Sequence, residues 1–342
     1  MLIKTNGFLF VGDPHLSSIT PGRRMDPNFS DTVLDKLAQA GRIADERGLQ
    51  VVITGDLFDR AKDNQLRMLS KVIKLFQSFA LKPLCLIGNH DRAETTLTEG
   101  TALELVQASG AVDLLLTLQP RIFEINGQRV LLWGVAHGST IPDRIPKDIV
   151  PLEQRDIHVM VTHHDIAFDR SYPGALNPFE ISGVPLVVNG HMHLSRPSVS
   201  RGSTVWHNPG NIVRMSLDCK DQVPRVWAWS PELPQALNPI DLEYTADILN
   251  MVGRQVDASP EAETAILLES SFSQLLREES RMESVRTDDA SLLLEDLQEM
   301  FSIRDVSPVA KALILGLYQK RLGMAEGEDI AALPPELLTK MG

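Results

Sequence analysis

Short apolar runs alternate with longer amphipathic segments along the first 110 residues. The short runs predict strands and the longer segments predict helices, because side chains repeat every two residues in a strand and every 3.6 in a helix. In chain order we predict strand 8–11, helix 31–47, strand 49–54, helix 63–80, strand 83–87 and helix 98–109. This alternation favours a largely parallel sheet with helices packed on it.

Between residues 112 and 229 the pattern changes to short β-like runs with little helical periodicity. These runs cover 112–118, 121–125, 129–135, 158–162, 186–188, 204–206 and 225–229. A helix-rich half followed by a strand-rich half predicts an α/β domain built of two packed, mixed sheets flanked by helices.

The chain changes texture again after residue 230. Residues 231–262 begin with a Pro-punctuated run and are predicted to be a linker, which bounds a main domain of residues 1–230. Residues 263–342 are predicted to form a small acidic helical region. Residues 1–230 hold 24 acidic and 24 basic side chains and residues 231–342 hold 21 and 9, so the net charge of −12 belongs to the C-terminal third.

Composition narrows the classes of protein. The two cysteines, Cys85 and Cys219, allow neither a disulfide framework nor a Cys-based zinc site. No window approaches 18 uncharged apolar residues, so we expect no membrane span and a cytoplasmic location. No basic run marks a nucleic-acid footprint, which argues against tight nonspecific DNA binding but leaves DNA open as a substrate held by metal ions.

Five predicted strands run straight into clusters of metal-capable side chains. The clusters stand in "FLFVGDPHL", "VVITGDLFDR", "LCLIGNHDR", "HVMVTHHDI" and "LVVNGHMHL". Each cluster by itself is more often a polar loop than a metal site. Ligands of open α/β sheets sit at the carboxyl ends of the strands, so five such clusters should pool their side chains along one edge.

The chemistry of the clustered side chains indicates two metal ions. Nitrogen and oxygen donors without cysteine suit divalent ions such as Mn²⁺, Fe²⁺ or Zn²⁺. The donors exceed the needs of one ion, which points to a two-metal site with a shared carboxylate.

The five clusters, in this order, resemble the calcineurin-like metallophosphoesterase superfamily. Its motifs D-x-H, G-D-x-x-D, G-N-H-D, a later histidine and G-H-x-H stand here at residues 13–15, 55–59, 88–91, 163 and 190–193. The resemblance covers residues 8–215 and implies the metallophosphoesterase β-sandwich, two mixed sheets flanked by helices. It also implies a phosphoester hydrolase with two divalent metal ions, which we expect to be Mn²⁺, with Fe²⁺ and Zn²⁺ as the alternatives.

The resemblance also implies the residues of the site. The metal ligands would be Asp13, His15 and His193 for one ion, Asn89, His163 and His191 for the other, and Asp56 as the bridge between them. His90 would be the catalytic histidine, close to the scissile phosphate and not itself a ligand. Asp91 is expected to assist catalysis by orienting His90 or its loop.

Several neighbouring polar residues have a structural interpretation beside a functional one. His164 follows His163, but adjacent strand residues face opposite ways and the family pattern favours the first of the pair. Asp59 is expected to support the site without binding an ion. Arg23 and Arg24 either meet a substrate phosphate or form a solvated loop pair. Structural or surface roles are expected for the other histidines, His137, His158 and His207, although His207 could line the site.

The motifs leave the phosphoester open, but two features favour a DNA repair nuclease of the SbcD type. Residues 204–229 resemble the strand–Pro-Gly–strand ending of that group, with Asn211 where serine is usual. That group also carries C-terminal helices that engage the coiled coil of an SMC-type, SbcC-like ATPase. Residues 263–322 either dock such a partner or pack on the catalytic domain.

Two other functions are open. A stand-alone phosphodiesterase or phosphatase acting on nucleotides or other small phosphoesters fits the neutral main domain. A binding scaffold that has lost catalysis is the third, and the complete ligand set argues against it. A homodimer is also left open.

Overall fold

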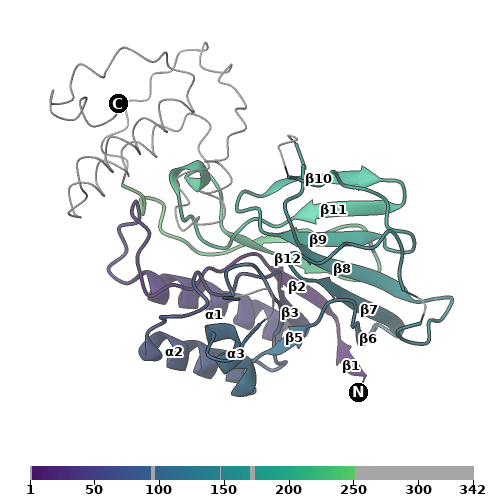
Figure 1. Ribbon diagram of the computed structural model, residues 1–342, viewed down its shortest axis with the longest axis horizontal. Coiled ribbons are helices and arrows are strands. Elements are labelled where there is room, and N and C mark those ends of the chain that lie inside the picture. The colour runs from purple at the N-terminus through teal and green to yellow at the C-terminus, as the bar shows by residue number, and fades with distance from the viewer. Residues whose placement is uncertain (1, 94–96, 147, 170–173, 251–342) are drawn as a thin grey trace, which may run out of the picture. The chain divides into compact units, whose positions relative to one another are not determined.

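The computed structural model describes residues 2–93, 97–146, 148–169 and 174–250. Two β-sheets stack face to face in this part of the chain (Figure 1). One has seven strands in the order β1 (Ile3–Thr5), β6 (Arg121–Ile125), β7 (Gln128–Val135), β8 (Ile157–His163), β9 (Leu186–Gly190), β11 (Thr204–Asn208) and β10 (Arg196–Arg201). The other has six strands in the order β13 (Asn238–Asp241), β12 (Arg225–Trp229), β2 (Gly7–Val11), β3 (Leu49–Ile53), β4 (Leu84–Leu86) and β5 (Asp113–Leu115).

Both sheets have a parallel centre and antiparallel additions. Strands β2, β3, β4 and β5 run parallel, and β12 joins β2 antiparallel. In the other sheet β7, β8, β9 and β11 run parallel, while β6 and β10 each pair antiparallel with a neighbour. The predicted pair of mixed sheets is confirmed.

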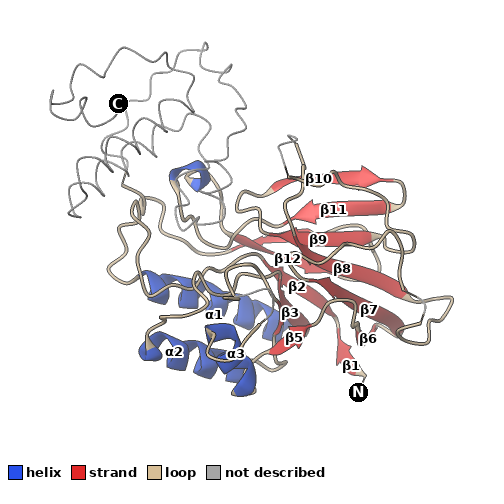
Figure 2. Ribbon diagram, viewed as in Figure 1, coloured by secondary structure: helices blue, strands red, loops and turns tan. Residues whose placement is uncertain are grey.

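The helices lie on one side of this sandwich. Helices α1 (Phe29–Arg47), α2 (Leu66–Gln77) and α3 (Ala102–Ala108) all pack on the outer face of the six-stranded sheet (Figure 2). Helix α1 ends at Gly48, whose left-handed φ of 66° lets its amide bond back to the last turn. Loops cover the outer face of the other sheet, where Ile141 and Ile181 pack against Trp133 and Trp206. Within the described residues, helices therefore flank one sheet only.

Aromatic side chains fill the space between the sheets. Every residue of β2 is buried, and Phe8 stacks on Trp229 at 5.2 Å and meets the edge of Phe123 at 4.9 Å. Phe123 belongs to the opposite sheet, so this contact joins the two layers. The fully apolar sequence of β2 follows from its position, since both faces of a central strand are covered.

The strands that the sequence pattern does not predict lie at sheet edges or beside them. Strands β1, β10 and β13 are three of the four terminal strands of the two sheets; the fourth, β5, lies within the predicted run 112–118. An edge strand has one unpaired side and can be polar, so β10 with the sequence RPSVSR carries no apolar alternation. Strand β13 lies inside the segment predicted as a linker, 231–262. The domain boundaries at 230 and 262 stay predictions, and residues 263–342 lie outside the described residues.

No helix among the described residues is long and apolar enough to cross a membrane.

Replacing Phe8 with alanine tests the contact between the layers. We expect Phe8→Ala to lower the free energy of unfolding by about 3–5 kcal/mol, because the lost ring leaves a cavity between two sheets. Leu66→Ala, on an exposed side chain of α2, is the control and should change it by less than about 0.5 kcal/mol. Urea unfolding followed by tryptophan fluorescence measures both, and equal effects would contradict the assigned core.

Candidate metal centre

The carboxyl ends of five strands bring the predicted ligands together. Asp13 follows β2, Asp56 follows β3 and Asn89 follows β4, while His163 ends β8 and His191 follows β9. Three strands belong to one sheet and two to the other, so the site lies where both sheets present the same ends. Among the described residues, groups with donor atoms within 4.8 Å of one another include Asp13, His15 and His193, then Asp56, His163 and His191, and also His15, Asp56 and His90.

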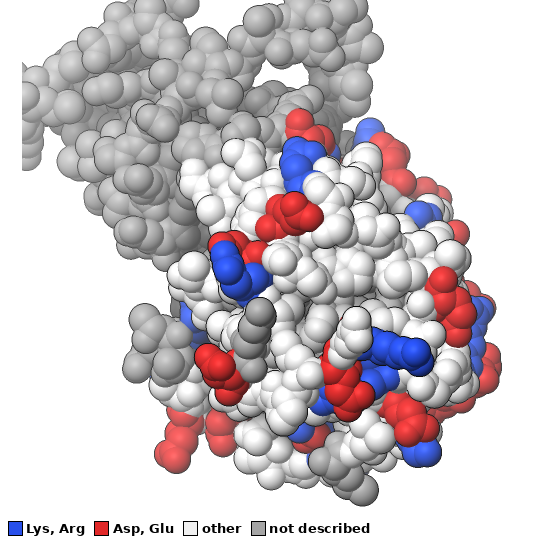
Figure 3. Space-filling view, turned by 90° about the vertical axis from the view of Figure 1, so that its right-hand side faces the viewer, with Lys and Arg blue, Asp and Glu red and all other residues white. Residues whose placement is uncertain are grey.

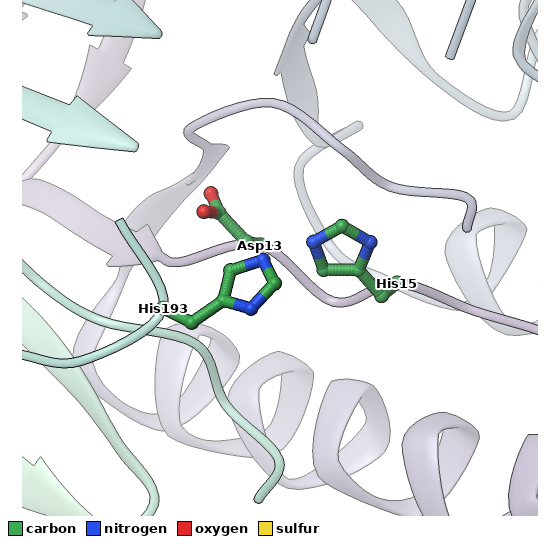
Figure 4. Close-up of side chains that lie close together, drawn as sticks. All are labelled: Asp13, His15 and His193. Atoms are coloured by element: carbon green, nitrogen blue, oxygen red, sulfur yellow. The ribbon is translucent and has the colours of Figure 1, made fainter. Parts of the chain in front are cut away.

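The first group is buried and contains a carboxylate oxygen without a hydrogen-bond donor in the described part of the chain. Figure 4 shows Asp13 and His15 on one segment and His193 on another, with the three side chains close together. The rings of His15 and His193 meet edge to face at 4.7 Å. Asp13 is 1% exposed, and its Oδ2 has no hydrogen-bond partner among the described residues. A buried carboxylate oxygen without a donor is costly unless a cation coordinates it.

The second group converges on the side-chain oxygen of Asn89. Asn89 Oδ1 lies 3.2 Å from His163 Nε2 and 3.0 Å from His191 Nδ1. His163 Nε2 is also 3.1 Å from Asp56 Oδ2. An amide oxygen, a carboxylate oxygen and two imidazole nitrogens aimed at one place form a donor set that suits a divalent transition metal.

Asp56 faces both groups. Its Oδ2 is 3.1 Å from His163 Nε2 on one side and 3.6 Å from His15 Nε2 on the other. Its Oδ1 accepts a hydrogen bond of 2.9 Å from the backbone amide of His90. This geometry fits the predicted bridge between two ions.

Burial and the mutual charges of these groups shift their pKa values in opposite directions. Burial raises the pKa of Asp13. Burial also acts to raise the pKa of Asp56, but His163 and His90 outweigh it and hold that pKa well below the usual range. For His163, burial acts to lower the pKa, and the carboxylate of Asp56 outweighs it and raises the pKa to about 9. A cation that replaces this proton would keep the same negative charge compensated.

Four predicted ligands have a backbone conformation that L-residues rarely adopt. The φ angles are 24° at Asp13, 45° at His15, 47° at Asp56 and 75° at His191. Such residues each cost of order 1–3 kcal/mol and persist where the surrounding structure holds them for function.

The glycines of the motifs make room for the ligands. A Cβ on Gly88 would lie 2.0 Å from Asp56 Oδ1, and one on Gly55 would lie 2.3 Å from His163 Nδ1. A Cβ on Gly190 would lie 2.7 Å from both Asp13 Oδ1 and His163 Nδ1. The glycines of these three motifs are therefore required by close approach to a ligand side chain.

The structure separates the parts played by His90, Asp91 and Asp59. The ring of His90 lies edge to face with His15 at 4.9 Å, and its Nδ1 is 2.8 Å from the backbone carbonyl of Asp59. The carboxylate of Asp91 is fully buried and accepts 3.0 Å hydrogen bonds from the amides of Phe58 and Gly88. Asp91 thus joins the second and third motif loops, and the backbone of Asp59 orients His90.

The adjacent histidines His163 and His164 face opposite ways, as expected for neighbours in a strand. His163 points into the site, whereas His164 Nε2 lies 2.7 Å from the carbonyl of Ser139. Arg24 forms a buried pair with Asp26 and donates to the carbonyl of Arg214, so it is structural and not a solvated loop residue.

Of the three remaining histidines, His158 and His207 contact aromatic side chains. His158 lies 3.1 Å from Trp133 Nε1, and His207 lies against Trp227 at a ring distance of 4.3 Å. His137 is different, because it forms a further group of potential ligands with Asp165 and His191.

Two supporting residues were missed by sequence reasoning. Gln222 accepts from the amide of Ser195 and donates to the carbonyl of His193 and to Asn211, so it fixes the loop that carries His193. Asn189 of β9 is fully buried and connects this strand to the end of β8 through three hydrogen bonds, with Thr162 and with the amide and carbonyl of His164. Lone polar residues at these positions carry no sequence signal, since only the fold shows what they contact.

Two groups of buried carboxylate and imidazole donors around one aspartate fit a site for two metal ions. The sequence model of the family "Calcineurin-like phosphoesterase" matches residues 7–195, more than half of the chain. The chain therefore belongs to the calcineurin-like phosphoesterase family and is a metal-dependent phosphoester hydrolase with two divalent metal ions.

Comparisons with individual proteins add nothing on the substrate. No curated protein matches the chain. Similar solved structures are a hypothetical protein from Thermus thermophilus (TM-score 0.42, 13% identity, 70% of this chain and 99% of that one), the NAD nucleotidase NadN of Haemophilus influenzae (0.40, 10%, 69% and 50%) and a 5′-nucleotidase precursor from Thermus thermophilus (0.40, 14%, 68% and 53%). The chain spans about half the length of the two nucleotidases, and similarity at this level carries no information on its substrate.

A methyl group at Gly88 tests the metal centre directly. We expect Gly88→Ala to weaken Mn²⁺ binding by more than about 10-fold, because the added Cβ displaces Asp56 from its bridging position. The control is Gly22→Ala, where nothing lies within 4 Å of the added atom. Titration calorimetry with Mn²⁺ measures both variants. Unchanged Mn²⁺ affinity in Gly88→Ala would contradict the assignment of Asp56 as a metal ligand.

Proposed function

We propose that the protein is a DNA nuclease of the SbcD type that binds two Mn²⁺ ions and works with an SMC-type coiled-coil ATPase in DNA repair or recombination. The observation that carries the hydrolytic part is the shared position of Asp56 between two ligand groups. Asp13, His15 and His193 would hold one ion, and Asn89, His163 and His191 the other. When bound, the two ions clamp the phosphate and provide hydroxide near neutral pH.

We propose that His90 serves the leaving group. Its Nδ1 lies 2.8 Å from the carbonyl oxygen of Asp59, which only accepts hydrogen bonds, so Nδ1 carries a proton. Nε2 is then the atom through which the ring takes up or delivers a proton. We propose that protonated His90 gives this proton to the leaving oxygen, and that Asp91 acts indirectly by holding the loops.

Replacing His90 separates proton transfer from metal binding. We expect His90→Ala to lower hydrolysis of a dinucleotide by about 100-fold or more, since its alkoxide leaving group needs a proton. Hydrolysis of bis-p-nitrophenyl phosphate should fall less, because p-nitrophenolate leaves without one. Steady-state rates with both esters measure the effect, and calorimetry should still show two bound Mn²⁺ ions. Equal losses for the two esters would remove the proton-donor role.

Two features support DNA and an ATPase partner. Pro209–Gly210 belongs to the ending that resembles the SbcD group, and its backbone lies against the first metal motif, since a Cβ on Gly12 would be 1.8 Å from the Gly210 carbonyl. Asn211, which stands where that group usually has serine, accepts a hydrogen bond from Gln222. The proposed docking segment, 263–342, lies outside the described residues and rests on its sequence alone.

The second candidate function is hydrolysis of nucleotides or other small phosphoesters, and the balance of 24 acidic and 24 basic side chains in residues 1–230 favours it. Lys and Arg side chains alternate with Asp and Glu on the face in Figure 3, with a broad uncharged area between them. This face carries no basic track for a nucleic-acid backbone.

Substrate range distinguishes these functions. We expect the Mn²⁺-loaded protein to cleave linear DNA and bis-p-nitrophenyl phosphate, and a chain lacking residues 263–342 to keep the second activity. A gel assay for DNA and release of p-nitrophenol measure the two. Cleavage of the small diester alone would favour the second candidate, and cleavage of neither would leave a binding scaffold. A truncated chain that aggregates would show that the segment belongs to the body of the protein.

We also propose a cytoplasmic location. The two cysteines, Cys85 and Cys219, are buried and form no disulfide, which suits a reducing compartment.

A further inference from the structure

An arginine and a histidine outside the family motifs meet beside the second ligand group. Arg92 follows the motif after β4, and His137 follows β7 of the opposite sheet. Arg92 Nη2 lies 3.0 Å from His137 Nδ1. The ring of His137 in turn lies 5.4 Å from the ring of His191 and 6.3 Å from that of His163. The imidazole of His137 thus lies between the Arg92 guanidinium and the proposed ligands.

The chemistry of the pair fixes which atom donates. A guanidinium has five N–H donors and no acceptor, so Nδ1 of His137 must accept and the ring is neutral with its proton on Nε2. The backbone allows the close approach at Gly138, whose φ is 79° and where an added Cβ would lie 3.2 Å from Arg92 Nη2. His137 therefore positions a permanent positive charge without adding one of its own.

A fixed positive charge is unfavourable next to two divalent cations. Arginine stays charged at any physiological pH, and like charges this close repel each other in a partly buried setting. Both Arg92 and His137 are half-buried, so solvent screens the repulsion only in part. The carboxylate of Asp165, whose Oδ2 lies 3.2 Å from His191 Nε2, offsets part of this charge. A substrate with more than one negative charge offsets more of it, because one phosphate could lie at the metal centre and the next on the guanidinium.

We propose that Arg92, held by His137, is the binding site for the phosphate adjacent to the scissile one in a nucleic-acid strand. This proposal rests on the proposed nuclease function and names the feature of the substrate that the site selects. Arginine suits the role because its planar donors match phosphate oxygens in pairs. The reaction itself stays on the metal ions and His90, so Arg92 determines which phosphoesters bind well.

Paired model substrates test the proposal. The p-nitrophenyl esters of thymidine 5′-phosphate and of thymidine 3′-phosphate are each compared with and without a second phosphate on the other sugar hydroxyl. We expect the second phosphate to raise kcat/KM of the Mn²⁺-loaded protein about 10-fold in one polarity, the effect of a charge-assisted hydrogen bond. Arg92→Met should abolish that gain, and at saturating Mn²⁺ its rate with bis-p-nitrophenyl phosphate should equal that of the unaltered protein.

Two controls separate a local contact from general electrostatics. Arg47→Met removes the same charge at the end of α1. The carbonyl of Arg47 accepts a hydrogen bond from Asn6, which precedes β2, so Arg47 lies near the end of β2 opposite to the metal centre. It should keep the full gain. His137→Ala leaves the charge of Arg92 but removes its support, so the gain should shrink without disappearing. Calorimetry with thymidine 3′,5′-bisphosphate, thymidine 5′-diphosphate and the two monophosphates gives the same comparison as binding affinities, without turnover.

The outcomes are distinct. If Arg92→Met keeps the gain, or loses the activity on bis-p-nitrophenyl phosphate as well, the subsite is wrong. Arg92 could instead strengthen the binding of thymidine 5′-diphosphate relative to the 5′-monophosphate, with no such effect for the 3′,5′-bisphosphate. In that case Arg92 and His137 recognise a pyrophosphate and the nucleic-acid assignment is wrong. If the unaltered protein shows the gain yet leaves linear DNA intact, the subsite stands and the nuclease function fails.

Discussion

The position of Asp56 between two sets of histidines is the interaction on which the site depends. A carboxylate that is 1% exposed needs nearby positive charge, and here His163 Nε2 and His15 Nε2 both lie close to its Oδ2, at 3.1 and 3.6 Å. The histidines around it hold the pKa of Asp56 well below its usual range although burial acts to raise it. The same carboxylate can therefore serve two cations, which is the requirement of two-metal hydrolysis.

The scaffold supplies this arrangement through the stacking of two sheets. Asp13, Asp56 and Asn89 follow strands of one sheet, whereas His163 and His191 belong to the other. The ligands meet only if the sheets keep their relative position, and aromatic contacts such as Phe8 with Phe123 provide this. Stability and metal binding are thus linked through the layer between the sheets. Four proposed ligands have a left-handed backbone, which is unfavourable locally and is held in place by the surrounding structure.

A second level of support comes from residues that bind backbone instead of metal. Asp91 joins two motif loops, Asn189 joins two strand ends, and Gln222 holds the loop of His193. Each is a polar side chain that satisfies backbone groups near the site, where unpaired amides and carbonyls would be costly. Asp91 was expected to orient His90 or its loop, and its carboxylate accepts from the amides of Phe58 and of Gly88, which precedes His90 in that loop. The ring of His90 contacts the carbonyl of Asp59.

The central strands, the helices α1 to α3 and the set of metal-capable residues were all predictable from the amino-acid order, because buried strands are continuous apolar runs and each runs into its motif. The edge strands β1, β10 and β13 were not, since their polar faces leave no pattern. The pattern also did not predict that, in the described part of the chain, the helices pack on the outer face of one sheet only. Contacts between distant segments, such as Arg92 with His137 or Gln222 with His193, emerge only once the chain is folded. Periodicity reports which side of an element is buried, whereas the partner across the interface depends on how the two sheets pack.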